Sequence, residues 1–138
     1  MQLAPQYNDV AAEVGRFLEQ RLQAVGKMGI AAQHVALDPG IGFSKRAEQS
    51  LEALHGIPRL VSLGRPVYVG LSRKSFLGAL TGDPVEGRLA AGLGATVAAL
   101  ALGARIFRTH DVRETVAALR LAESILAPAD AVAPGAPA

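Results

Sequence analysis

The sequence predicts an α/β fold in which a first helix is followed by three strand–helix units. Two patterns lead to this prediction: segments with helical periodicity alternate with short apolar runs, and those runs are apolar almost without interruption. Continuous apolar runs are typical of strands covered on both faces, and strand–helix alternation is typical of a parallel sheet. We therefore expect a parallel sheet with helices outside it.

The first helix is predicted from one apolar face that repeats at helical spacing, and its ends are predicted from capping residues. Asn8 is the predicted N-cap and Gly26 the predicted stop. The last helix starts with the pattern of Asp111 followed by Glu114, in which Asp111 is the expected cap. The apolar face of the first helix consists of Val10, Val14, Phe17, Leu18, Leu22 and Val25.

The three predicted strands cover residues 34–38, 66–70 and 105–108, and each runs into a polar or glycine-bearing loop. A helical region at 47–63 follows the first strand, with an interruption expected near Gly56 and Pro58. A short helix is expected directly after the loop that follows the second strand.

A long helix then begins with Asp83 as N-cap, Pro84 at the first helical position and Glu86 three residues after the cap. It ends near Gly103, where the third strand follows.

Three parallel strands do not make a self-sufficient sheet, and a leading helix without a strand before it is the second half of a strand–helix unit. The natural completion is a (β/α)₈ TIM barrel, which needs about 250 residues. We therefore predict that residues 1–127 form the C-terminal portion of such a barrel. The alternative is a complete small three-layer α/β domain. Residues 128–138, rich in Ala and Pro, are predicted to be a disordered tail.

Composition narrows the classes of partner. The 138 residues carry a formal net charge of only +2 and no basic cluster interleaved with aromatics, which disfavours nucleic-acid binding. Cysteine is absent, which excludes disulfides and fits a reducing cytoplasm. The apolar stretch 89–104 is shorter than the ~20 residues of a membrane span, and polar residues at 2–9 argue against a signal peptide. We expect a cytoplasmic protein without nucleic-acid or membrane partners.

Polar side chains gather at the predicted carboxyl ends of the strands, where parallel α/β folds bind their ligands. Asp38 follows the first strand, Lys74 the second, and Arg108 and His110 the third. Arg108 and His110 are two residues apart, so they share a face if the strand continues through them. A guanidinium beside an imidazole suits a diphosphate. These residues predict a site for an anionic, phosphate-bearing small molecule.

Each of these residues also has a structural interpretation. Asp38 can bond two N–H donors of a heterocycle, or it can cap its own loop at Gly40 or Ile41. Lys74 can belong to a solvated basic loop, and His110 can be a structural histidine bonded to the backbone. Phe43 can stack on a ligand or plug the barrel mouth.

Three motifs carry a family resemblance: DPGIGFSK at 38–45, GLSRKS at 70–75 and RTHD at 108–111. In this order and spacing they closely resemble dihydropteroate synthase, and the resemblance runs from Met1 to about Leu126. That family has the (β/α)₈ fold. It joins 6-hydroxymethyl-7,8-dihydropterin diphosphate to p-aminobenzoate, giving 7,8-dihydropteroate and diphosphate in folate biosynthesis.

The resemblance implies a role for each matching residue. Asp38 would bind the amino-pyrimidine edge of the pterin, and Lys74 would bond its oxo group. Arg108 and His110 would hold the diphosphate, with Mg²⁺ sharing its charge. Two residues that would flank p-aminobenzoate are Phe43 and Ser75.

The chain also departs from the family, because the first five strands have no counterpart in it. In the family those strands supply a metal-binding asparagine, further pterin ligands and two mobile loops, so no metal ligand is expected within this segment. We expect that the isolated chain neither closes a barrel nor catalyses at a useful rate.

Two other functions compete with the synthase interpretation. A methyltetrahydrofolate-type methyltransferase is disfavoured, because it has no need of a diphosphate clamp at Arg108 and His110. A non-catalytic pterin- or phosphate-binding or assembly module would pair its free apolar helices with another chain. The Ala/Gly-rich helix at 86–102 suits close helix contact, and the resemblance implies a homodimer through the late helices.

Overall fold

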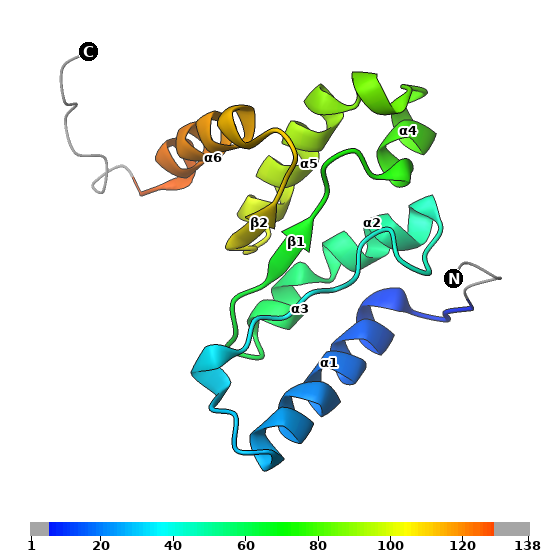
Figure 1. Cartoon of the computed structure of the whole chain (residues 1–138). Helices are drawn as coiled ribbons and strands as arrows, with labels where there is room; N and C mark the ends of the chain where they lie inside the picture. The colour runs from blue at the N-terminus through cyan, green and yellow to red at the C-terminus, as the bar shows by residue number, and fades with distance from the viewer. Residues whose placement is uncertain (1–5, 129–138) are drawn as a thin grey trace.

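The computed structural model describes residues 6–128 and has an α/β fold in which helices surround a small parallel sheet (Figure 1). The predicted tail therefore lies outside the described residues, apart from Pro128, as do Met1 and Gln2. The helices are α1 (Val10–Lys27), α2 (Ala47–His55), α3 (Ile57–Val61), α4 (Ser75–Thr81), α5 (Leu89–Ala101) and α6 (Val112–Leu126). The strands are β1 (Tyr68–Gly70) and β2 (Ile106–Arg108).

The sheet is parallel, as predicted. Strand β1 pairs with β2 in a register that sets Val69 opposite Phe107 and Gly70 opposite Arg108. On the other side of β1, Leu37 forms a single parallel bridge with Val67. The carboxyl ends of the three chain segments consequently point to one edge of the sheet.

The predicted strand at 34–38 is wrong in extent. A 3₁₀ turn occupies Ala32–His34, and the ladder contact is limited to Leu37. Two hydrogen bonds make this bridge: Leu37 N–H donates to Pro66 O at 2.9 Å, and Tyr68 N–H donates to Leu37 O at 2.8 Å. Within residues 6–128 only one flank of this segment has a partner, and of its apolar residues Leu37 is buried, Val35 is half-buried and Ala36 is exposed.

The N-cap of helix α1 lies one residue after the predicted cap, and the helix ends one residue beyond the predicted stop. Asp9, not Asn8, is the N-cap: its carboxylate accepts the Ala12 N–H at 2.9 Å. Glu13 completes the cap, because its Oε1 accepts the N–H groups of both Asn8 (2.8 Å) and Asp9 (3.2 Å). The helix continues through Gly26 to Lys27.

The predicted interruption of the second helical region is confirmed, since Gly56 separates α2 from α3. A side chain at this position would meet helix α1, because a Cβ added to Gly56 would lie 2.9 Å from the Cβ of Ala11. The glycine therefore serves close packing between α1 and the break.

The long helix starts differently from its predicted capping pattern. Residues Val85–Gly87 form a 3₁₀ turn, and α5 begins only at Leu89. The turn has no side-chain cap, and its N-cap position is held by Pro84 rather than Asp83. Asp83 makes a different contact instead of a capping bond: the Arg88 Nε donates to the Asp83 carbonyl at 3.1 Å. That bond holds the chain in a turn before the α-helix can start.

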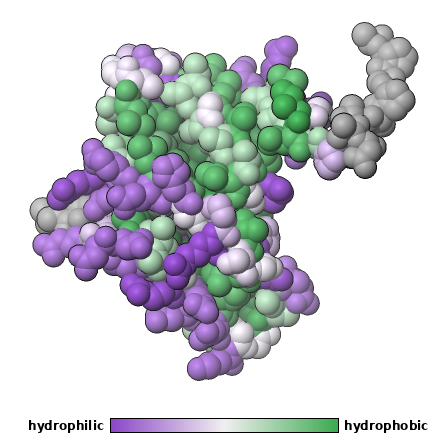
Figure 2. Space-filling view, turned by 180° about the vertical axis from the view of Figure 1, so that it is seen from behind, coloured by the Kyte–Doolittle hydropathy of each residue, from purple (hydrophilic) through white to green (hydrophobic). Residues whose placement is uncertain are grey.

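The surface is uneven in polarity. Figure 2 shows apolar residues concentrated over the part of the molecule that carries α4, α5 and α6, whereas hydrophilic residues cover the region around α1. Within residues 6–128, no helix combines the length and the apolar character that a membrane crossing requires.

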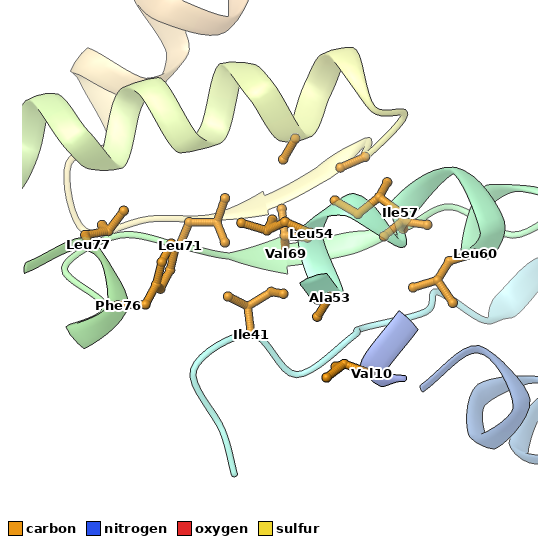
Figure 3. Packing of buried hydrophobic residues seen from close by; sticks show 13 residues of the cluster. Val10, Ile41, Ala53, Leu54, Ile57, Leu60, Val69, Leu71, Phe76 and Leu77 are labelled. Carbon is orange, nitrogen blue, oxygen red and sulfur yellow. The ribbon is translucent and has the colours of Figure 1, made fainter. Parts of the chain in front are cut away.

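The core lies between the sheet and helices α2 and α3. Leu54 and Ile57 lie beside Val69 of β1 in Figure 3, and Ile57 and Val69 are almost completely buried. Burying each such side chain contributes about 1.5–3 kcal/mol, so this cluster fixes the sheet against the helices. The loops at the carboxyl ends of the strands start from this rigid base.

Candidate functional site

The polar residues predicted at the strand ends do come together at the carboxyl edge of the sheet. Asp38 follows the Leu37 bridge, Lys74 lies four residues after β1, and Arg108 is the last residue of β2. The Lys74 ammonium interacts electrostatically with both Asp38 and Arg108. The roles of these residues remain predictions, but their proximity is a feature of the structure.

The loop after Asp38 is shaped by two glycines. Gly40 and Gly42 have φ angles of +66° and +75°, which residues other than glycine rarely adopt. The Asp38 Oδ1 accepts the Gly40 N–H at 2.8 Å, so Asp38 does cap its own loop, as one of the two interpretations expected. This bond fixes the carboxylate at the edge of the sheet, where the side chain stays exposed.

Lys45 closes the same loop and was not among the predicted site residues. Its Nζ donates to the carbonyls of Gly40 (3.1 Å) and Phe43 (3.4 Å) and lies 5.7 Å from the centroid of the Tyr7 ring. Burial lowers the pKa of Lys45, and the nearby Asp38 carboxylate partly opposes that shift. A lysine that ends a glycine-rich loop is the signal that could have identified it.

Lys74 lies against the glycine-rich loop. Its Nζ is 3.7 Å from the centroid of the Phe43 ring, a cation–π contact, and a Cβ at Gly42 would come within 3.0 Å of its Cδ. Burial lowers the pKa of Lys74; Asp38 opposes this shift, and Arg108 reinforces it. Phe43 itself is 53% exposed. Ser75, the first residue of α4, is exposed next to Lys74.

His110 is held by a serine rather than by the strand. Strand β2 ends at Arg108, so the condition under which Arg108 and His110 would share a strand face is not met. Instead, the His110 Nδ1 lies 2.9 Å from the Ser72 Oγ, and the His110 backbone N–H donates to the same oxygen at 3.3 Å. Both Arg108 and His110 are exposed.

Asp111 occupies the N-cap position of α6 as predicted, but its side chain makes no capping bond. Its Oδ1 forms an ion pair with Arg73 Nη2 at 2.8 Å, and its Oδ2 accepts the Ser72 hydroxyl at 3.4 Å. The hydrogen bond from Arg73 is the main cause that lowers the pKa of Asp111. The ion pair is thus complete above the ordinary aspartate pKa of about 3.9 and is lost as the pH falls through the lower folded value.

The predicted site residues do not share one cavity. Asp38 lines a cavity of about 420 Å³ with Tyr7, Phe17 and Lys45 on the side of α1. Arg108 lines a separate cavity of about 540 Å³ with Tyr68 and Phe107 on the side of α6. Among residues 6–128, no three His, Cys, Asp or Glu side chains lie close enough to hold a metal ion.

This fold and this arrangement of strand-end residues define the class of protein. A family model described as "Pterin binding enzyme" matches residues 1–110, and the chain belongs to that family. Relatives that match most of this chain are named dihydropteroate synthase. Dihydropteroate synthase of Escherichia coli (strain K12) is 40% identical over 126 residues, which cover 91% of this chain and 45% of that protein.

Solved structures of the same family match the chain as well. Dihydropteroate synthase from Xanthomonas albilineans in complex with 7,8-dihydropteroate is 42% identical with a TM-score of 0.87, covering 93% of this chain and 50% of that one. The same enzyme with 4-aminobenzoic acid gives 42% identity and a TM-score of 0.87, over 91% of this chain and 46% of the other. The predicted resemblance and the partial-barrel fold are confirmed, and the chain spans about half the length of these relatives.

Proposed function

We propose that this chain carries the pterin, p-aminobenzoate and diphosphate contacts of a dihydropteroate synthase of folate biosynthesis. One observation supports this most directly: the Lys74 ammonium interacts electrostatically with both Asp38 and Arg108, while the centroid of the Phe43 ring lies 3.7 Å from it. A single ligand with a heterocyclic ring at one end and phosphate at the other matches this set of one carboxylate and two cations.

The ring end of the ligand binds at Asp38 and Lys74. A carboxylate accepts the paired N–H donors of an amino-pyrimidine, and an ammonium donates to the ring oxo group. The bond from the Gly40 N–H to Asp38 Oδ1 orients the carboxylate before the ligand arrives. Because Lys74 is half-buried, its charge is less screened than that of a surface lysine.

The p-aminobenzoate lies between Phe43 and Ser75. Phe43 offers an exposed aromatic face, and Ser75 offers a hydroxyl one residue after Lys74. Stacking and hydrogen bonding at these two residues would set the amine against the pterin methylene. The main contribution of the protein to the reaction of this amine is the correct placement of the two reactants.

The diphosphate end binds at Arg108 and His110. The C–O bond between the pterin methylene and the diphosphate breaks, the amine nitrogen forms the new C–N bond, and the amine loses a proton. Negative charge accumulates on the departing diphosphate, and fixed cationic or N–H donors stabilise it. Mg²⁺ is proposed from the family alone, and the described residues form no ligand cluster for it, so no step here depends on it.

Arg108→Ala tests the diphosphate contact. The affinity of the chain for inorganic diphosphate should fall by about tenfold to 100-fold, because a charge-assisted hydrogen bond to phosphate is lost. Isothermal titration measures this, with Arg16→Ala as control, an exposed arginine on α1. Equal diphosphate affinities for the two variants would contradict the assignment.

The proposal also concerns the isolated chain. Since it spans about half the length of the relatives, we expect it to bind ligands weakly and to release diphosphate far more slowly than an enzyme. A turnover number in the ordinary enzyme range of about 1–10³ s⁻¹ for the 138-residue protein would refute this. A cytoplasmic location is proposed on the absence of cysteine.

A homodimer through the late helices belongs to the same proposal. An apolar cavity of about 360 Å³ lies where α2, α4 and α5 meet, and it includes Phe76, Ala95 and Leu102. Ala98→Glu in α5 should shift the chain to a monomer in light scattering, whereas Ala31→Glu, at an exposed position outside the late helices, should not. A wild-type chain that stays monomeric at high concentration would contradict the dimer.

A further inference from the structure

The loop after β1 contains a strained turn at Arg73. The Lys74 N–H donates to the Leu71 carbonyl at 3.3 Å, which closes a four-residue turn with Arg73 at its third position. Arg73 has a φ angle of +60°, in the left-handed region that favours glycine or asparagine at this position of a turn. An arginine therefore occupies a conformation that its surroundings must stabilise.

Arg88 makes a contact that stabilises this turn. Its Nη1 donates to the Arg73 carbonyl at 3.3 Å, and its Nε donates to the Asp83 carbonyl at 3.1 Å. The two bonds use different nitrogens of one rigid, planar group, so Arg88 fixes the turn relative to the segment before α5. The ion pair with Asp111 holds the side chain of Arg73, whereas Arg88 acts on its backbone.

Gly78 in α4 leaves room for the Arg88 guanidinium. A Cβ added at Gly78 would lie 2.6 Å from the Arg88 Cζ, closer than side-chain atoms approach one another. The guanidinium therefore packs directly against α4, the helix that follows Lys74. Glycine inside a helix is unfavourable relative to alanine, and the close approach of Arg88 accounts for a glycine here.

The side chain of Lys74 takes its direction from the turn, because Lys74 lies between the turn and α4. Its own backbone is extended, with φ −63° and ψ 147°, and α4 begins at the next residue. The first turn of α4 is anchored in the core by Phe76 and Leu77, each 3% exposed. With that side fixed, the conformation of Arg73 decides whether the Lys74 Nζ reaches its position 3.7 Å from the centroid of the Phe43 ring.

We propose that Arg88 is a positioning residue, which holds the left-handed turn at Arg73 and thereby keeps the Lys74 ammonium against the Phe43 ring. Arg88 itself touches no ligand. The proposal rests on the proposed function in one respect, because the ligand that Lys74 meets is taken to be a pterin. Without Arg88 the turn relaxes toward right-handed conformations, and Lys74 moves away from Phe43.

Proton NMR of the ligand-free chain tests the position of Lys74 directly. Protons above an aromatic ring resonate at low frequency, so the ε-methylene signal of wild-type Lys74 should be shifted in that direction. Its loss in Lys74→Met identifies the signal. Arg88→Ala should move it toward the frequency of an exposed lysine such as Lys27. A wild-type signal at that ordinary frequency, or a signal that Arg88→Ala leaves in place, would overturn the proposal.

Gly78→Ala separates positioning from general stability. The added methyl group displaces the flexible end of Arg88 without removing a charge, and alanine is the better helix former, so the urea midpoint should not fall. The Lys74 signal should nevertheless move as it does in Arg88→Ala. Gly26→Ala, at a glycine of α1 with open space around it, should leave the signal in place. An unchanged signal in Gly78→Ala would contradict the proposal even if Arg88→Ala fails to fold.

A second background tests whether Arg88 acts through the backbone of Arg73. Asparagine adopts positive φ angles more readily than arginine. In a chain that already carries Arg73→Asn, the further change Arg88→Ala should therefore leave the Lys74 signal nearly unchanged. An equal displacement of the signal with and without Arg73→Asn would exclude the turn as the route.

Titration with a dihydropterin gives the functional readout. Arg88→Ala and Gly78→Ala should each weaken binding by about tenfold, because the Lys74 donor is no longer held in place. If the wild type binds the pterin and both variants bind it equally well, the proposal is wrong. Lys74 signals that respond as expected in a chain without pterin affinity would contradict the proposed function and leave the Arg88 assignment standing.

Discussion

Replacing Lys74 by methionine is expected to lower the affinity for a dihydropterin by about tenfold to 100-fold, because the methionine keeps the apolar stem but removes the ammonium. In the structure that ammonium interacts electrostatically with Asp38 and Arg108 and lies 3.7 Å from the centroid of the Phe43 ring. Its loss removes a donor to the ring oxo group and one of the two lysine charges that interact with the Asp38 carboxylate. Titration of the chain with a dihydropterin, followed by calorimetry, measures the change.

The matched control is Lys27→Met, the same substitution at an exposed position at the end of α1. It should leave pterin affinity unchanged, because the end of α1 lies on the opposite side of the molecule from the loops that follow the strands (Figure 1). Equal losses for both variants would show that a general loss of positive charge, rather than the Lys74 contact, governs binding.

Replacing Ile57 by alanine is expected to lower the free energy of unfolding by about 2–5 kcal/mol. Ile57 has 0% exposure and begins helix α3 beside the sheet, so the surrounding side chains have little room to close over the cavity. Urea denaturation followed by circular dichroism measures the change in unfolding free energy.

Ile125→Ala makes the same chemical change on α6, where the side chain is 71% exposed. Its effect should stay within about 0.5 kcal/mol, because little buried surface is lost there. A small effect at Ile57, or a large one at Ile125, would mean that the core is not centred between the sheet and α2–α3.

The alternation of strands and helices could be predicted from the sequence because it depends on local periodicity, and the break at Gly56 could be predicted for the same reason. The strand at 34–38 could not be predicted in extent. Its apolar residues indicate burial, but the ladder depends on a partner that only the tertiary structure supplies, and within residues 6–128 that partner is Val67 alone.

Asp111 shows a second limit. The pattern of Asp111 and Glu114 predicted the start of α6 correctly, because a capping residue marks a helix boundary. The bonding partner of the Asp111 side chain was not predictable in this way. Arg73, 38 residues earlier, offers a charged partner at 2.8 Å, and an ion pair with a hydrogen bond replaces the local capping bond.

The candidate site was predictable as a group of strand ends, but its supporting contacts were not. Asp38, Lys74 and Arg108 could be selected because each follows an apolar run. Ser72 and Lys45 were missed because their importance comes from what they touch: a histidine ring in one case and two loop carbonyls in the other. Spacing along a chain carries no information on such contacts.

Asp38, Lys74, Arg108 and His110 are proposed to bind the two ends of one ligand. The most direct measurement compares the affinities of the chain for dihydropterin diphosphate, for the dihydropterin without phosphate and for inorganic diphosphate. Asp38→Asn should weaken the first two ligands and spare inorganic diphosphate, whereas Arg108→Ala should weaken the first and third and spare the free pterin. Dihydropterin diphosphate that responds to only one of the two substitutions would contradict a single two-ended site.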